Sequence, residues 1–131
     1  MSAMTVEKKS EKRISIRFDL ASGPRLGPGK IALLKAIAET GSISAGARQL
    51  GMSYKKAWLL IDAFNSTFRE PVLSTETGGE QGGGATLTET GREVLRLFGE
   101  LEAEAASATE ATRKAFDQLV KTAPSKPARK K

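Results

Sequence analysis

Residues 43–61 constrain the fold most, because two short helical patterns meet there around one glycine, Gly51. Ala47 is small at the point where the two helices would touch, and Gly51 lies where the backbone would leave the first helix. The apolar residues that would form their shared core are Leu50, Met52, Ala57 and Leu60 or Ile61. Two helices that cross steeply through a tight turn need these residue types at these places. The spacing predicts a helix-turn-helix, with a plain helical hairpin as the alternative.

The sequence before this motif predicts a strand and a helix. Apolar and polar residues alternate over residues 14–20, which is typical of a half-buried strand. Glycines and prolines interrupt the alternation over residues 23–29, and Pro28 suits the first turn of a helix. The apolar face of that helix comprises Ile31, Leu34, Ile37 and Ala38. Gly41 is predicted to follow its last turn as the C′ residue.

The sequence after the motif predicts a β-hairpin. Residues 71–77 and 85–87 have the composition of short strands, and the residues between them are mostly glycine. We therefore expect a mainly α fold in which residues 14–87 form a winged helix-turn-helix domain. The expected order is strand, helix, helix, turn, helix, strand, strand and a long helix.

The segment 88–121 is predicted to be one helix of about nine turns. Apolar and small residues recur along it at alternating steps of four and three, as in a heptad seam. These residues are Val94, Phe98, Leu101, Ala105, Ala108, Thr112, Ala115 and Leu119. One small domain cannot bury so long a stripe, so we expect a two-fold homodimer built on this dimerisation helix. The alternative is that the helix folds back on its own domain.

Length and charge indicate where such a chain works and what it binds. The 131 residues suffice for one ordinary domain, with residues 1–13 as a flexible N-terminus and residues 122–131 as a disordered basic tail. No apolar run could span a bilayer and no secretory signal is visible, which favours a cytoplasmic protein with no membrane partner. A net charge of +6 favours a polyanionic partner.

The composition also restricts the chemistry of the chain. It contains no cysteine and no histidine, which removes thiolate catalysis, the commonest general base and the commonest metal ligands. We therefore expect no catalytic residues, no metal site and no cofactor, and we do not expect an enzyme.

The start of the second motif helix is the predicted DNA-binding site. Ser53 would be its N-cap, with Tyr54, Lys55 and Lys56 in the turn that enters the major groove. The lysines can contact phosphates or guanine edges, and the helix N-terminus adds positive charge. An ordinary solvated lysine pair is the alternative. The aromatic and apolar residues further along this helix are predicted to be core: Trp58, Ile61, Phe64 and Phe68.

Four stretches of the chain resemble one known family. They are Gly-Ser-Ile-Ser at 41–44, Ser-Tyr-Lys-Lys-Ala-Trp at 53–58, Thr-Gly-Gly-Glu-Gln-Gly-Gly-Gly-Ala at 77–85 and Leu-Thr-Glu-Thr-Gly at 87–91. Together they resemble the N-terminal DNA-binding domain of ModE-type molybdate-dependent transcriptional regulators, a LysR-like winged helix. The resemblance covers residues 14–120.

The resemblance implies a homodimer that binds double-stranded DNA at the nucleoid and regulates transcription. It adds Ser44 to the DNA-binding residues and places the wing alongside the DNA, where Gly82, Gly83 and Gly84 could approach the DNA backbone closely; a merely flexible loop is the alternative for these glycines. Full-length relatives continue into a molybdate-binding domain, whereas this chain ends in a short tail, so molybdate sensing is not expected. The competing hypothesis is a protein-interaction or nucleoid-associated module of the same fold.

Overall fold

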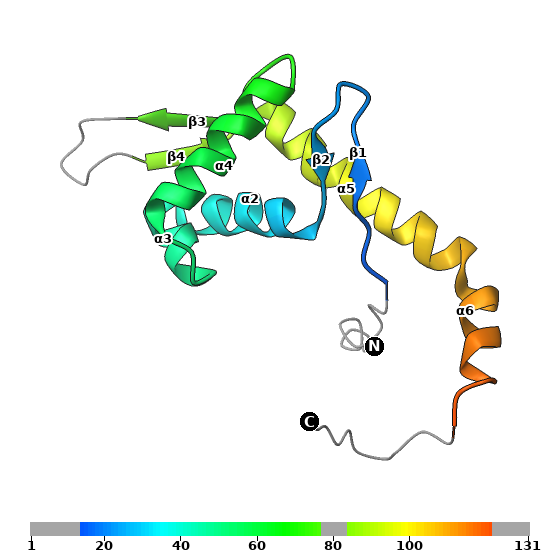
Figure 1. The fold of residues 1–131 in the computed structure, drawn as a ribbon. Coiled ribbons are helices and arrows are strands. Elements are labelled where there is room, and N and C mark those ends of the chain that lie inside the picture. The colour runs from blue at the N-terminus through cyan, green and yellow to red at the C-terminus, as the bar shows by residue number, and fades with distance from the viewer. Residues whose placement is uncertain (1–13, 77–83, 122–131) are drawn as a thin grey trace, which may run out of the picture.

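The computed structural model describes residues 14–76 and 84–121. The predictions for residues 1–13, for the hairpin tip at 77–83 and for residues 122–131 lie outside this part of the chain. The described elements, shown in Figure 1, are β1 (Phe18–Asp19), β2 (Arg25–Leu26), α2 (Pro28–Thr40), α3 (Ile43–Gln49), α4 (Tyr54–Thr67), β3 (Leu73–Glu76), β4 (Gly84–Leu87), α5 (Glu89–Ala108) and α6 (Glu110–Asp117). Their order confirms the mainly α fold with a hairpin after the helix-turn-helix.

Helix α2 forms the centre of the hydrophobic core. It begins at Pro28 after the N-cap Gly27, and Gly41 ends it with a φ angle of 84°. The predicted buried face is confirmed at three positions, Ile31, Leu34 and Ile37. Ala38 is exposed instead, and the remaining buried positions are Leu33 and Ala36. Helices α3, α4 and α5 all contact α2, so one apolar helix connects the whole domain.

The helix-turn-helix is held by two serine caps and two glycines. The Oγ of Ser42 accepts a hydrogen bond from the Ala45 amide at 2.9 Å, and α3 begins there. Gly51 turns the chain with a φ angle of 68°, as the sequence predicts. Gly46 allows α3 to cross α2, because a Cβ at this position would lie 2.7 Å from a side-chain carbon of Ile37.

The N-terminal strand is shorter than predicted and has an unpredicted partner. Only Phe18 and Asp19 form β1, which pairs antiparallel with β2 so that Phe18 faces Leu26. A tight turn joins the two strands, in which Gly23 has a φ angle of 118° and the Leu20 amide donates to the Pro24 carbonyl at 2.8 Å. The sequence did not predict β2, because a strand of two residues is too short to show an alternating pattern of its own.

The hairpin of β3 and β4 is attached firmly to the helices. Leu73 pairs with Leu87 and Glu76 with Gly84, so the strands run antiparallel. The side chain of Asn65 on α4 accepts hydrogen bonds from the backbone amides of Val72 and Leu73, at 2.8 and 3.3 Å. These bonds fix the base of the wing relative to α4.

The prediction of one continuous helix after residue 88 is wrong. Helix α5 ends at Ala108, the chain turns at Thr109, and α6 begins at Glu110 in a different direction (Figure 1). The hydroxyl of Thr109 donates to the Ala105 carbonyl at 2.7 Å, a bond that competes with regular helix geometry. The guanidinium of Arg113 donates to the Ala106 carbonyl at 2.7 Å and to the Thr109 hydroxyl at 3.0 Å. Side chains therefore satisfy the backbone groups that the break frees.

The seam predicted along this segment is buried only at its start, before the break at Thr109. Val94 and Phe98 are buried, at 8% and 3% exposure, in the core of their own domain. Leu101 is half-buried and packs against that core, whereas Leu119 is 82% exposed. The alternative of folding back on the domain therefore holds for the first two turns of the seam.

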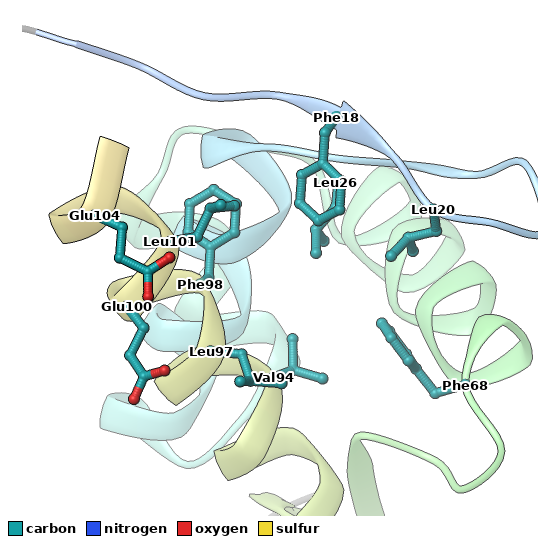
Figure 2. Close-up of a pocket in the computed structure, with 10 residues that line it drawn as sticks. All are labelled: Phe18, Leu20, Leu26, Phe68, Val94, Leu97, Phe98, Glu100, Leu101 and Glu104. Atoms are coloured by element: carbon teal, nitrogen blue, oxygen red, sulfur yellow. The ribbon is translucent and has the colours of Figure 1, made fainter. Parts of the chain in front are cut away.

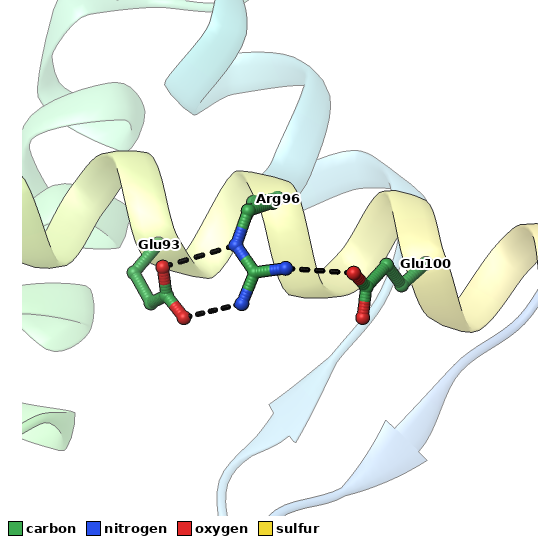
Figure 3. A network of polar contacts seen from close by, with 3 residues as sticks. All are labelled: Glu93, Arg96 and Glu100. Carbon is green, nitrogen blue, oxygen red and sulfur yellow. Dashed lines mark hydrogen bonds and ion pairs between the residues drawn. The ribbon is translucent and has the colours of Figure 1, made fainter.

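The outer face of α5 carries an ion-pair network (Figure 3). Arg96 binds Glu93 and Glu100, each through an N–O distance of 2.6 Å. The hydrogen bond from Arg96 lowers the pKa of the Glu93 carboxyl, and the bonds from Glu93 raise the pKa of the guanidinium above its ordinary value. All three groups are solvated, so the network contributes only modestly to the stability of the helix.

Candidate nucleic-acid interface

The first turn of α4 has the geometry of a capped helix N-terminus. The Oγ of Ser53 accepts a hydrogen bond from the Lys56 amide at 3.1 Å, and the Ser53 backbone is extended. The predicted N-cap role of Ser53 is therefore confirmed. The outermost amides of a helix have no partner within it, so this end is a source of donors and partial positive charge.

The side chains of this turn lie in solvent. Tyr54 is 55% exposed, and both Lys55 and Lys56 are exposed. Within residues 14–76 and 84–121, no acidic side chain forms an ion pair with either lysine. The first turn of α4 contains no acidic residue. Both charges are therefore available to an anionic ligand.

The opposite face of α4 anchors the helix to the domain. Ala57, Ile61 and Phe64 are buried, and Phe64 stacks on Phe68 with ring centroids 6.0 Å apart. The core prediction is confirmed for Ile61 and Phe64, and Phe68 is half-buried. It is wrong for Trp58, which is 45% exposed. One helical step of 100° from Ala57 moves Trp58 to the edge of the buried stripe.

The other predicted DNA-binding residues, Ser44 and the wing glycines, do not belong to α4. Ser44 is exposed in the first turn of α3, two residues after the Ser42 cap. Gly84 is half-buried, and a Cβ there would lie 3.5 Å from the Gly41 carbonyl, which accepts a hydrogen bond from the Ala85 amide at 2.9 Å. Gly84 thus lies where the wing joins the α2–α3 turn. Gly82 and Gly83 lie outside the described residues.

Sequence reasoning missed Leu59, which is 56% exposed on α4. A count of helical angles from Ala57 could have found it, because a residue two positions further along the helix points about 200° away. It lies one turn after both lysines, at i+4 from Lys55 and i+3 from Lys56. An apolar side chain therefore stands next to the two cations on the outward face of α4.

A second exposed surface is an apolar groove between the N-terminal hairpin and α5, with a volume of about 420 Å³. Figure 2 shows Phe18 and Leu26 on one side and Phe98 and Leu101 on the other. Leu97, which is 50% exposed, also lines it. Two carboxylates of the same helix, Glu100 and Glu104, also line the groove. The groove is apolar inside and acidic along α5.

The described part of the chain contains no group of three His, Cys, Asp or Glu residues that could hold a metal ion. Among the same residues no helix is long and apolar enough to cross a membrane.

Residues 29–92 match the family described as bacterial regulatory helix-turn-helix protein, lysR family. The molybdenum-pterin-binding protein MopB of Rhodobacter capsulatus is 46% identical over 82 residues, which are 63% of this chain and 30% of that protein. The DNA-binding transcriptional dual regulator ModE of Escherichia coli K12 is 41% identical over 92 residues, 70% of this chain and 32% of that protein. The chain thus spans about a third of the length of these relatives.

The fold resembles a solved structure that is described as the crystal structure of a CbnR_DBD-DNA complex. The two chains superimpose with a TM-score of 0.52 and 20% sequence identity, over 67% of this chain and 95% of the other. At this identity the likeness establishes the fold, a winged helix-turn-helix. The match over residues 29–92, together with the similarity to ModE and MopB, shows that this part of the chain is a helix-turn-helix DNA-binding domain of the lysR type.

Proposed function

We propose that this chain binds duplex DNA as the DNA-binding part of a transcriptional regulator, with the first turns of α4 in the major groove. The observation that carries the proposal is the exposed pair Lys55 and Lys56, which the described acidic residues leave unpaired, at a capped helix N-terminus. Phosphates and guanine edges are the ligands that such a site favours. The proposed role is not enzymatic. A protein of this kind acts in the cytoplasm, at the nucleoid.

The relatives support this proposal by their named functions. The Escherichia coli relative is a DNA-binding transcriptional regulator, and the structural neighbour was solved as a complex with DNA. In helix-turn-helix proteins the second helix of the motif enters the major groove, and α4 holds that position here. Ser44 on α3 and Gly82, Gly83 and Gly84 of the wing are further proposed contacts with the DNA backbone.

The test is a titration of the protein against a pool of random duplexes at two salt concentrations, followed by sequencing of the retained DNA. We expect enrichment of an inverted repeat, and an affinity that falls with salt by a slope of about −0.9 per neutralised phosphate. Salt-sensitive retention without enrichment would instead indicate a nucleoid-associated protein. Failure to retain any duplex would contradict the proposal and favour a protein-interaction module.

The inverted repeat follows from a second part of the proposal, a homodimer with two-fold symmetry. Its two copies of α4 would lie about 34 Å apart or a multiple of that. The apolar groove beside α5 supports a dimer because it leaves Leu97 and Phe18 in solvent at 50% and 38% exposure. The remaining predicted seam residues stay proposed dimer contacts, but the turn at Thr109 divides them between α5, with Leu101, Ala105 and Ala108, and α6, with Thr112, Ala115 and Leu119. Val94 and Phe98 support it from within the core.

Leu97→Glu is expected to weaken the dimer about 100-fold or more. The new carboxylate would be buried against the partner and would stand near Glu100 and Glu104, which line the same groove. Leu97 is a cleaner choice than Leu101, because Leu101 also packs against its own core. Sedimentation velocity over a range of concentrations gives the dissociation constant.

The matched control is Ala103→Glu, which adds the same charge at an exposed position on the outer face of α5. It should leave the dimer unchanged. If Phe116→Glu on α6 dissociated the dimer and Leu97→Glu had no effect, the dimer interface would lie on α6 and not at the groove.

A further inference from the structure

Leu59 lies on the outward face of α4, away from the buried stripe. The buried stripe of this helix runs through Ala57, Ile61 and Phe64, and Leu59 projects about 200° away from Ala57. Its side chain is 56% exposed, so it contributes little to the core of this domain. Packing within the domain therefore does not explain a large apolar side chain at this position.

The charges around Leu59 indicate which kind of partner would cover it. Lys55 and Lys56 lie one turn earlier on the same face, and the described acidic residues form no ion pair with them. An apolar protein partner that covered Leu59 would also have to desolvate these two cations, which is costly. A polyanion would instead neutralise them while it covered the leucine. The arrangement favours DNA over a hydrophobic protein surface.

The chemistry of a leucine side chain restricts what it can recognise in DNA. It has neither a donor nor an acceptor, so it cannot bind the N7, O6, O4 or amino groups of the bases. The apolar group that base pairs present in the major groove is the C5-methyl of thymine. A leucine one turn after two lysines, on the same outward face, can therefore distinguish thymine from the other bases by contact with this methyl group.

We propose that Leu59 is a specificity-determining residue that contacts a thymine methyl group in each half of the operator. This inference rests on the proposed function, since it requires α4 to lie in the major groove. Trp58 is 45% exposed beside Leu59, but its indole N–H and its place at the edge of the buried stripe suit a contact with the phosphate backbone. The thymine preference is therefore assigned to Leu59 alone.

The experiment removes one methyl group at a time from the DNA. Each thymine of the selected operator is replaced in turn by deoxyuridine, symmetrically in both half-sites, and affinities are measured for the wild-type protein and for Leu59→Ala. One replacement is expected to weaken wild-type binding by about 4-fold per half-site, the effect of removing one buried methyl group. Leu59→Ala should bind more weakly and should be insensitive to that same replacement.

The control variant is Leu50→Ala, which removes an exposed leucine at the end of α3 rather than on α4. It should retain the wild-type response to every deoxyuridine. Circular dichroism melting of both variants shows that the fold is intact.

Three results would overturn the inference. Equal sensitivity of the wild type and Leu59→Ala at every thymine would show that the leucine contacts no methyl group, while DNA binding itself would stand. A selected half-site without an invariant thymine would lead to the same conclusion. Failure to bind any duplex would remove the proposed function, and this inference with it.

Discussion

Lys55→Ala combined with Lys56→Ala is expected to weaken duplex binding at least about 100-fold, because each lysine contact with a phosphate or guanine is worth ~1–3 kcal/mol. Both side chains are exposed in the first turn of α4, so their loss removes charge without disturbing the core. The salt dependence should also become shallower, by about 0.9 for each phosphate contact that is lost. Fluorescence anisotropy at several salt concentrations measures both quantities, and sedimentation should show an unchanged dimer.

The charge-matched control for this pair is Lys114→Ala combined with Lys121→Ala. Both lysines are exposed; Lys114 lies on α6, at the opposite end of the molecule from α3 and α4 (Figure 1), and Lys121 follows this helix. The control removes the same net charge, so it isolates position from overall electrostatics. If the two double variants lost affinity equally, α4 would not be the recognition helix, and binding would depend on total charge alone.

Gly91→Ala is expected to destabilise the domain by ~2–3 kcal/mol, although alanine is the better helix former. A Cβ at this position would overlap the carbonyl oxygen of Val72 and would lie 2.8 Å from a methyl carbon of Leu87. The obstacle is backbone at the start of the wing, which also accepts a hydrogen bond from the Thr88 amide at 3.0 Å. It therefore cannot move aside cheaply, and α5 would separate from the wing. Urea unfolding followed by circular dichroism measures the change.

Gly99→Ala, in the same helix, is expected to change the stability of the domain in the opposite direction. Gly99 is exposed, and nothing lies within 4 Å of the position that its Cβ would occupy. Alanine should therefore stabilise the domain by up to ~1 kcal/mol through helix propensity alone. Stabilisation by both substitutions would mean that α5 does not pack against the base of the wing as described.

The helix-turn-helix was predictable because local backbone geometry specifies it. Gly41 and Gly51 adopt positive φ angles that other residues avoid, and Ser53 caps α4 through a hydrogen bond within its own first turn. These requirements act over three or four residues, so the spacing of residue types along the chain reveals them. The same holds for Lys55 and Lys56, whose place in the first turn follows directly from the cap.

The orientation of individual apolar residues was harder to predict. Trp58 belongs to a helical pattern with Ile61 and Phe64, yet it is exposed because α2 and α3 cover only part of the circumference of α4. Leu59 was overlooked for the same reason. A sequence pattern shows that a helix has an apolar side, but the width of that side depends on the neighbours that pack against it.

The sequence by itself therefore determined the order of the elements from α2 to β4, the caps and turns of the motif, and the cationic first turn of α4. Only the tertiary structure decided which partner covers each apolar stripe. Val94 and Phe98 fit a heptad seam, yet they are buried in the core of their own domain, where α5 packs against α2 and the wing. Arg113 and Thr109 interrupt the helix that the seam would need. The physical reason is that periodicity fixes the face of a helix, whereas burial depends on contacts between segments far apart in the chain.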